Sequence, residues 1–433
     1  MKTSCSFFRM KPLALSFLFS LPCFFSHAAN HVVVANQSIQ SAIDGAASGD
    51  VIILTYPGEY TEHLAIAGKS LRLTSTNPDQ TSVLGNLVIS NLPANGKVTL
   101  DAFTLSGNIN ATGAGIVSLR NFTVAIGGGV IPNVETNGTS GLYLKSSTVE
   151  GTVTVHSKQD SLGNDAKLVV LQSDVREKLV SKAARSWIGY STMEQTYFEG
   201  LVEIVGNDFN GRVQGGIGID LNGAATNASI HNNKIAHFRD GGGNETNIGI
   251  RVDGGAKADV RNNTIHWNRY GSGTFTAMGV YVKSTTGTSI VANIMYNNNV
   301  SGGATTGHAN VWAPAQNVVV KYNALNSTGG SSLVAGGADN LAFITNTDSN
   351  GQHFLTNPAG YMEGRAGEDK GPPEVIYNDH DGSRNDIGPN GGRNYLPNGR
   401  TTNKPIPISF TAAPLVVPVG GIITIQSTGA VPK

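Results

Sequence analysis

One eight-residue pattern recurs four times in the second half of the chain, at 228–235, 258–265, 288–295 and 318–325, with each copy 30 residues after the one before. The sixth position of every copy is an asparagine between apolar residues, and these asparagines are Asn233, Asn263, Asn293 and Asn323. A buried amide must find partners for its donors and its acceptor. Asparagines stacked on one another can supply those partners.

Such stacking requires each repeat to be one coil of a solenoid, with equivalent residues about 4.8 Å apart, which is the spacing of neighbouring strands. The predicted fold is therefore all-β, a single-stranded parallel β-helix of about ten coils. The 54 glycines and the low share of charged residues, 14%, fit many short strands joined by tight turns. Because a repeat array grows by adding coils, we expect one elongated body.

The first residues of the chain have the features of an export signal. Arg9 and Lys11 precede an apolar run over 13–25, and Ser26-His27-Ala28 places small residues where a signal peptidase reads them. Residues 1–28 are therefore predicted to be a signal peptide of a secreted protein. Both cysteines lie inside it, and no later run is long and apolar enough to span a bilayer.

Residues 31–75 predict an N-terminal cap and the first coil, with apolar residues at helical spacing from Ile39 to Ala47. This segment resembles the opening of secreted right-handed β-helix proteins of the pectin-lyase-like superfamily. The resemblance rests on Ser38-Ile39-Gln40-Ser41-Ala42-Ile43-Asp44, Gly49-Asp50-Val51-Ile52, Pro57-Gly58-Glu59-Tyr60-Thr61-Glu62 and Lys69-Ser70-Leu71. It implies a right-handed helix with a capping helix, and it implies little about activity.

Residues 76–340 are assigned to the β-helix repeats. The longest interruption, 176–200, is expected to be a surface loop or a wall beside a binding site. Residues 341–400 lose the repeat, and 378–388 resembles the closing segment at the carboxyl end of many such β-helix proteins. Asp379, Asp381 and Asp386 in that segment could hold calcium, although their spacing departs from that of an EF-hand. Residues 401–433 predict a tail along the outside.

A solenoid interior is filled, so function must use outward side chains, and strand alternation identifies them. Asp220, Arg251, Tyr281 and Trp312 are predicted to form one outward column, and Asn222, Asp253 and Lys283 a second. The following strands are predicted to add a flank of pairs that occupy equivalent positions, with His231 beside Arg261 and Arg239 beside Arg269, together with Trp267. Aromatic rings, charges and stacked arginines on one face favour a polysaccharide ligand, and an acidic one in particular.

Three functions fit this face. A lyase acting on a uronate glycan needs a cation at the C6 carboxylate, supplied by Arg251 with Arg261 or by calcium on Asp220 and Asp253, and a base such as Lys283 or Tyr281. An inverting glycoside hydrolase could use Asp220 and Asp253, whose backbones are expected about 8 Å apart. A non-catalytic adhesin or matrix protein could use the same face, and Asp220 and Arg251 could also simply neutralise each other. The formal net charge of zero gives no indication of nucleic acid as a partner. The oligomeric state is not predicted.

Overall fold

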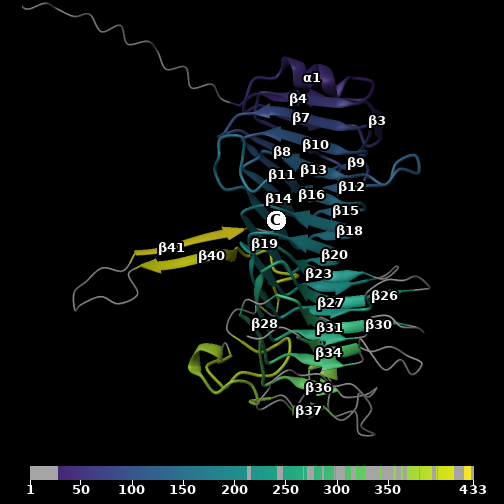
Figure 1. The fold of residues 1–433 in the computed structure, drawn as a ribbon. Helices are drawn as coiled ribbons and strands as arrows, with labels where there is room; N and C mark the ends of the chain where they lie inside the picture. The colour runs from purple at the N-terminus through teal and green to yellow at the C-terminus, as the bar shows by residue number, and fades with distance from the viewer. Residues whose placement is uncertain are drawn as a thin grey trace, which may run out of the picture.

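Each coil contributes three short strands, and equivalent strands of successive coils pair in parallel to form stacks along the molecule (Figure 1). The computed structural model describes residues 28–211, 216–240, 247–266, 268–270, 277–284, 287–296, 298, 308–313, 318–326, 341–343, 355–356, 362–363, 368–379, 381–392, 396, 398–413 and 424–430. The predicted parallel β-helix is confirmed. Within these residues no helix is both long and apolar enough to cross a membrane.

The first stack is a sheet of thirteen strands. Its members are β1 (Asn30–Val33), β2 (Val51–Leu54), β5 (Leu71–Ser75), β8 (Lys97–Asp101), β11 (Ile116–Arg120), β14 (Gly141–Lys145), β17 (Lys167–Leu171), β19 (Arg185–Gly189), β21 (Leu201–Val205), β24 (Asn227–His231), β28 (Lys257–Arg261), β32 (Thr288–Val291) and β35 (Val318–Lys321).

The second stack follows the first along every coil. It contains β3 (Glu59–Thr61), β6 (Ser82–Leu84), β9 (Thr104–Ser106), β12 (Thr123–Val124), β15 (Thr148–Val149), β18 (Asp174–Ser181), β20 (Thr192–Phe198), β22 (Asp208–Asn210), β25 (Lys234–Ala236), β29 (Thr264–His266), β33 (Ile294–Tyr296), β36 (Ala324–Asn326) and β37 (Leu341–Phe343).

The third stack completes each coil. Its members are β4 (Leu64–Ala67), β7 (Leu87–Leu92), β10 (Ile109–Gly113), β13 (Val134–Asn137), β16 (Val153–Val155), β23 (Ile217–Leu221), β27 (Asn247–Val252), β31 (Ala277–Val282) and β34 (His308–Trp312). The long strands β18 and β20 run through both the second and third stacks and join them into one sheet.

The interruption expected at 176–200 is wrong. Those residues form most of β18 and all of β19 and β20, and these strands pair in parallel with the coils on either side. The physical reason is alternation: Leu179, Ile188 and Phe198 are fully buried in the core, so this segment carries the same inward pattern as its neighbours. This extra coil and the coils within 30–75 explain why the first stack has more strands than the ten or so coils expected.

The helix α1 (Ile39–Gly45) covers the N-terminal end of the stacks, as predicted (Figure 1). Ser38 caps it by accepting a hydrogen bond from the Ser41 amide, and Glu62 accepts from the amides of Ile39 and Gln40. Ile39 and Ile43 are fully buried against the first coils. The helix thereby closes an apolar interior that would otherwise meet water.

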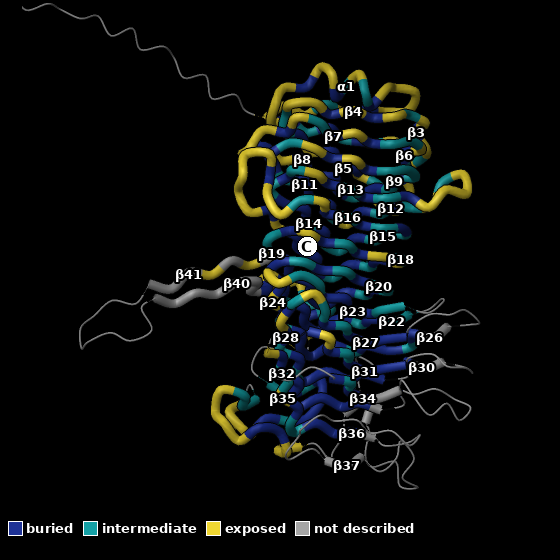
Figure 2. The backbone as a smooth tube through the Cα atoms, viewed as in Figure 1, coloured by how far each residue is buried: buried dark blue, intermediate teal, exposed yellow. Residues whose placement is uncertain are grey.

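The core is one continuous cluster of buried apolar residues, whose positions along the coils are coloured dark blue on the backbone in Figure 2. The asparagine ladder runs through it as predicted. Asn233, Asn263 and Asn293 each donate from Nδ2 to Oδ1 of the next asparagine at 3.0 Å, ending at Asn323. The backbone amide of each donor residue is bonded to that same oxygen. The ladder also continues upstream through residues that the repeat pattern does not identify, Asn207, Ser191, Ser173 and Ser147.

A sharp corner joins the first stack to the second in each coil. The residue immediately before the ladder residue has a positive φ, for example 52° at Asn262 and 54° at Tyr190. This left-handed residue turns the chain sharply from the first stack into the second. Its own side chain points outward, and the side chain of the following residue points into the ladder. The corners therefore present a regular line of side chains along the molecule.

The C-terminal residues run back along that line and form what we call the strap, which comprises the described residues 385–392, 396 and 398–402. Asn262 and Asn232 donate from their side-chain amides to strap carbonyls, those of Asp386 and Gly388 and those of Pro389 and Gly391. Further up the molecule the Tyr190 hydroxyl accepts from the Leu396 amide, and Gln172 donates to the carbonyls of Gly399 and Thr402. The strap is thus bound by one corner residue from each of several coils.

The strap also covers apolar surface. Ile387 packs with Val291, Ala292 and Ile294, and Ile406 packs with Trp187 and Tyr190 on the outside of the first stack. Beyond Ile406, β40 (Ile406–Ala413) and β41 (Thr424–Ala430) pair antiparallel in a hairpin that projects from the side of the molecule (Figure 1). The remaining short elements are β26 (Arg239–Asp240), β30 (Arg269–Tyr270), β38 (Leu355–Thr356), β39 (Met362–Glu363) and the 3₁₀ turn η2 (Val375–Tyr377).

Candidate functional site

The predicted outward column exists as a file of paired residues on the third stack. Asp220 on β23 pairs with Arg251 on β27, Arg251 with Tyr281 on β31, and Tyr281 with Trp312 on β34. Upstream, Tyr197 on β20 pairs with Asp220 and extends the file by one aromatic ring. We call these five residues the third-stack file.

The file faces outward because its neighbours in sequence face in. Ile250 and Val252 flank Arg251 and are fully buried, as are Val280 and Val282 beside Tyr281. The arginine itself is only partly buried, with 30% of its side chain exposed, whereas 12% of the Asp220 side chain is exposed. The register on which the predicted site depends is therefore present.

Asp220 and Arg251 form a two-pronged ion pair. Arg251 donates from Nε to Asp220 Oδ1 at 2.8 Å and from Nη2 to Oδ2 at 2.6 Å. The hydrogen bonds to Asp220 raise the pKa of Arg251 above its ordinary value, against the opposing effect of burial. Both aspartate oxygens are engaged, which fixes the guanidinium plane against the sheet.

Tyr197, at the N-terminal end of the third-stack file, interacts with a second group of polar residues. The Tyr197 hydroxyl donates to Glu199 Oε1 at 3.1 Å. Burial is the main cause that raises the pKa of Tyr197, and the Glu199 carboxylate adds to it. Glu199 also lies 3.3 Å from Lys158 Nζ. Tyr197 and Glu199 lie in the stretch that the sequence pattern assigns to an interruption, and recognition of its alternation would have identified them.

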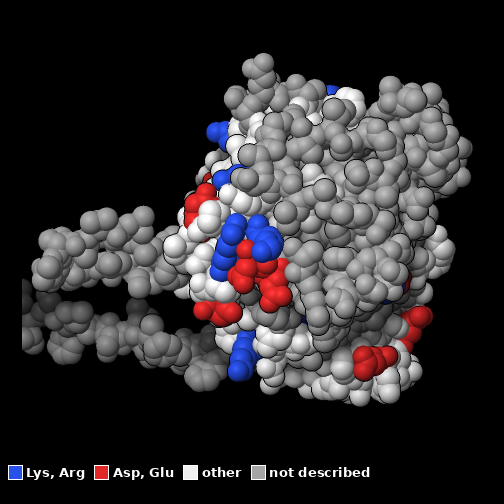
Figure 3. Space-filling view, turned by 90° about the horizontal axis from the view of Figure 1, so that it is seen from below, with Lys and Arg blue, Asp and Glu red and all other residues white. Residues whose placement is uncertain are grey.

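The second predicted column is also paired within itself. Lys283 Nζ lies 3.7 Å from Asp253 Oδ2, and Asp253 Oδ1 accepts from the Gly254 amide at 2.7 Å. An ammonium ion paired with a carboxylate has no lone pair with which to accept a proton. On the face seen from below the view of Figure 1, other Lys and Arg side chains also lie directly beside Asp and Glu side chains (Figure 3).

A metal at this face would have to use the same carboxylates. No group of three or more His, Cys, Asp or Glu side chains arranged to hold a metal ion is found among the described residues. Asp220 directs both oxygens at Arg251, whose positive charge opposes a calcium ion at that position. The donor set of Asp220 and Asp253 therefore does not fit calcium.

The predicted flank is not part of the same surface. His231 and Arg261 do pair with one another, but they end β24 and β28 in the first stack, on a different sheet from the third-stack file. The reason is that the chain turns between each third-stack strand and the first-stack strand that follows it, so His231 leaves the face that carries Asp220. Arg239 and Arg269 pair through their backbones in β26 and β30, while their side chains and Trp267 lie outside the described residues.

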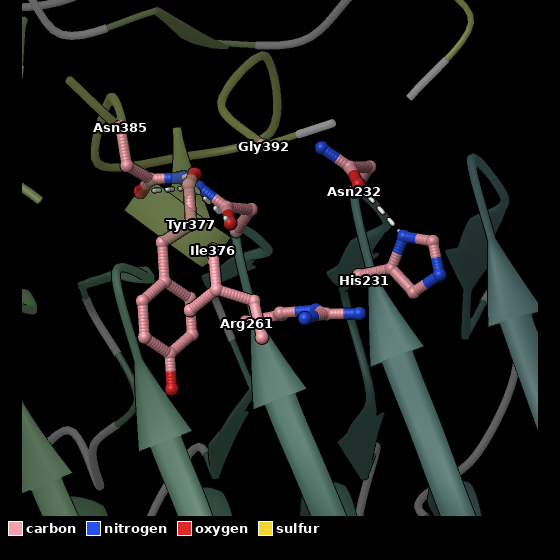
Figure 4. A pocket seen from close by; sticks show the side chains of 8 residues that line it. His231, Asn232, Arg261, Ile376, Tyr377, Asn385 and Gly392 are labelled. Atoms are coloured by element: carbon pink, nitrogen blue, oxygen red, sulfur yellow. Dashed lines mark hydrogen bonds between the residues drawn. The ribbon is translucent and has the colours of Figure 1, made fainter. Parts of the chain in front are cut away.

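His231 and Arg261 instead line a pocket of about 310 Å³ beneath the closing segment (Figure 4). Its walls are the corner residues Asn232 and Asn262 on one side and residues from 376 to 392 on the other. Sequence reasoning identified the two basic residues but not the pocket, because the strap that covers it is more than 100 residues away in the chain.

No protein-family model matches the chain, and no curated protein matches it. Among solved structures, the chain is similar to the PL6 family alginate lyase AlyGC, with 13% identity and a TM-score of 0.41, over 78% of this chain and 56% of that one. A mutant of that enzyme matches over the same shares with a TM-score of 0.38. The chain thus spans little more than half of those structures, and similarity at this level carries no information on activity.

Proposed function

We propose that this chain is a secreted protein that binds a polysaccharide along the third-stack file. One observation carries the proposal: Tyr197, Tyr281 and Trp312 occupy successive outward positions on either side of the fixed Asp220–Arg251 pair. Aromatic rings stack on pyranose faces, and an oriented ion pair offers donors and acceptors to hydroxyl groups. A linear glycan lying across the coils would meet one such group on each coil.

The ion pairs on this face favour binding over catalysis, because the charged groups that a reaction would need already bind one another. Elimination from a uronate needs a cation that is free to neutralise a carboxylate, yet Arg251 already holds Asp220 with two hydrogen bonds. Hydrolysis with inversion needs one carboxyl group that can donate a proton to the leaving group, yet Asp220 and Asp253 both lie in ion pairs, with Arg251 and Lys283 respectively. Ion pairs of this kind suit a fixed surface that recognises a ligand without changing it.

The test is a binding and activity panel on purified protein with neutral and uronate glycans, with and without calcium. Binding is followed by calorimetry, elimination by the absorbance of unsaturated product, and hydrolysis by reducing ends. We expect binding without product, and we expect Trp312→Ala to weaken it by about tenfold, equivalent to about 1.4 kcal/mol. Tyr322→Ala is the matched control, since Tyr322 is a partly exposed aromatic residue on a first-stack corner.

Two results would reject this function. Product release that depends on Arg251 or Lys283 would identify an enzyme. Glycan binding that is equally insensitive to Trp312→Ala, Tyr281→Ala and Tyr197→Ala would place the binding surface elsewhere.

A further inference from the structure

The pocket beneath the strap has a chemical character of its own. It is formed by two segments that meet only in the folded chain: the ends of β24 and β28 with their corners, and residues 376–392 of the closing segment. Its volume, about 310 Å³, lies at the lower end of the range of small-ligand sites, about 300–1,000 Å³. It is on a different sheet from the third-stack file, so it does not depend on the function proposed there.

The corner asparagines are fully used in building the pocket. Asn232 Nδ2 donates to the carbonyls of Pro389 and Gly391 at 2.8 and 2.7 Å. Asn262 Nδ2 donates to Asn385 Oδ1 at 3.2 Å and to the Asp386 carbonyl at 2.7 Å. These amides hold the strap in place and have no donor left for a ligand.

His231 is fixed by the same network. Because Asn232 donates through its nitrogen, its Oδ1 accepts from His231 Nδ1 at 2.8 Å. The ring is 98% buried, with 2% exposed, and its Nε2 has no hydrogen-bond partner, although Glu203 Oε1 lies 3.6 Å away. The imidazole therefore forms a rigid polar wall beside Arg261 (Figure 4).

Arg261 is the group with unused hydrogen-bonding capacity. Its side chain extends along the pocket beside His231 (Figure 4). The guanidinium donates no hydrogen bond to any described residue, and its nearest acid is Asp259, with 3.5 Å between Nη1 and Oδ2. A guanidinium has five N–H donors in a planar fork that matches a carboxylate. Because 24% of its side chain is exposed, Arg261 can present this fork to a ligand in the pocket.

The rim adds an apolar surface beside the arginine. Ile376 is 72% exposed, which is unusual for a large aliphatic side chain, and the ring of Tyr377 lies next to it on η2 (Figure 4). An aromatic ring and an exposed aliphatic side chain in the same pocket as a guanidinium suit a ring-shaped ligand that carries a single carboxylate.

We propose that this pocket binds one uronic acid residue, with its carboxylate on Arg261 and its ring against Ile376 and Tyr377. The neighbouring acids Glu203 and Asp259 offset part of the positive charge. The site therefore selects a singly charged sugar acid over a multiply charged anion such as phosphate.

The experiment is titration of the full-length protein with D-glucuronate, with D-glucose as the neutral counterpart and inorganic phosphate as the small anion, followed by ligand-observed NMR. We expect glucuronate to bind and glucose and phosphate to bind at least tenfold more weakly. Arg261→Met should weaken glucuronate binding at least tenfold, and Arg261→Lys should weaken it less, because the charge is kept while the fork is lost.

Two controls separate this site from general charge effects and from misfolding. Lys257→Met removes a cation from the exposed start of the same strand and should leave glucuronate binding unchanged. Ile376→Ser alters only the exposed rim, so it should weaken binding several-fold without changing the melting temperature. The proposal is overturned if wild-type protein binds no glucuronate, if glucose or phosphate binds equally well, or if Arg261→Met binds glucuronate like Lys257→Met.

Discussion

Replacing one rung of the asparagine ladder should destabilise the whole solenoid. Asn263 is fully buried and its side chain takes part in five hydrogen bonds. Its Nδ2 donates to the carbonyls of Ile230 and Arg261 and to Asn293 Oδ1, and its Oδ1 accepts from both nitrogens of Asn233. Asn263→Ala removes all five and leaves the Asn233 backbone amide without its acceptor.

The cost follows from those bonds. An orphaned buried N–H costs about 1–3 kcal/mol, and each of the other four bonds contributes about 0.5–1.5 kcal/mol. Because effects within one network are not additive, we expect a loss of about 4 kcal/mol in the free energy of unfolding. Asn263→Asp should cost more, because an oxygen would replace Nδ2 and face three acceptors at 2.9–3.0 Å.

The assay is urea unfolding followed by far-UV circular dichroism, with m-values compared to check that the transition stays cooperative. Asn227→Ala is the matched control, since Asn227 is an exposed asparagine at the start of the neighbouring strand β24. A loss below about 1 kcal/mol for Asn263→Ala, or an equal loss in the control, would show that the ladder does not stabilise the coil in the way argued from its hydrogen bonds.

Three further outcomes are expected. Arg251→Met should destabilise the protein by about 1–3 kcal/mol because Asp220 keeps a largely buried, unpaired charge; Asp220→Leu combined with Arg251→Met should recover part of that loss in thermal melts. Burial raises the pKa of Asp386 from 3.8 to about 6. Above pH 6 the carboxylate is ionised in a buried position, which lowers the free energy that holds the strap on the coils. This loss of stability disappears as the pH falls toward 3.8, where the group is protonated in both the folded and the unfolded state. Asp386→Asn should therefore stabilise the strap at pH 8 by about 1 kcal/mol, after allowance for solvent screening, and have no effect at pH 4, measured by hydrogen exchange of 385–392. Burial, Lys97 and Arg120 lower the pKa of Lys145, so Lys145→Met should raise the melting temperature slightly at pH 7, and a fall would contradict this reading.

The sequence predicted the parts of this structure that repeat. The 30-residue period and the alternation around Arg251 and Tyr281 fix both the coil and the outward face, because a strand has only two faces to choose from. Residues 176–200 escaped this reasoning because their coil is shorter than those downstream and has Ser191 where the later coils have asparagine. What could not be predicted is pairing between distant segments, such as Asn232 with Pro389, since neither period nor alternation connects a corner with a strap 157 residues away.

The corners explain how one repeat can stabilise a fold and also create a site. A left-handed residue before each ladder position sends one side chain out of the coil, and nothing in the repeat specifies what that side chain must be. Where it is Gln172, Asn232 or Asn262, it donates to the strap, whereas the Tyr190 hydroxyl accepts from the Leu396 amide. The strap then covers the outside of the first stack and forms the pocket in which the Arg261 guanidinium donates no hydrogen bond to any described residue. Function on this molecule should therefore be sought where the strap crosses the corners as well as on the third-stack file, and exchanging Asn232 for alanine should open the pocket while leaving the buried ladder at Asn233 intact.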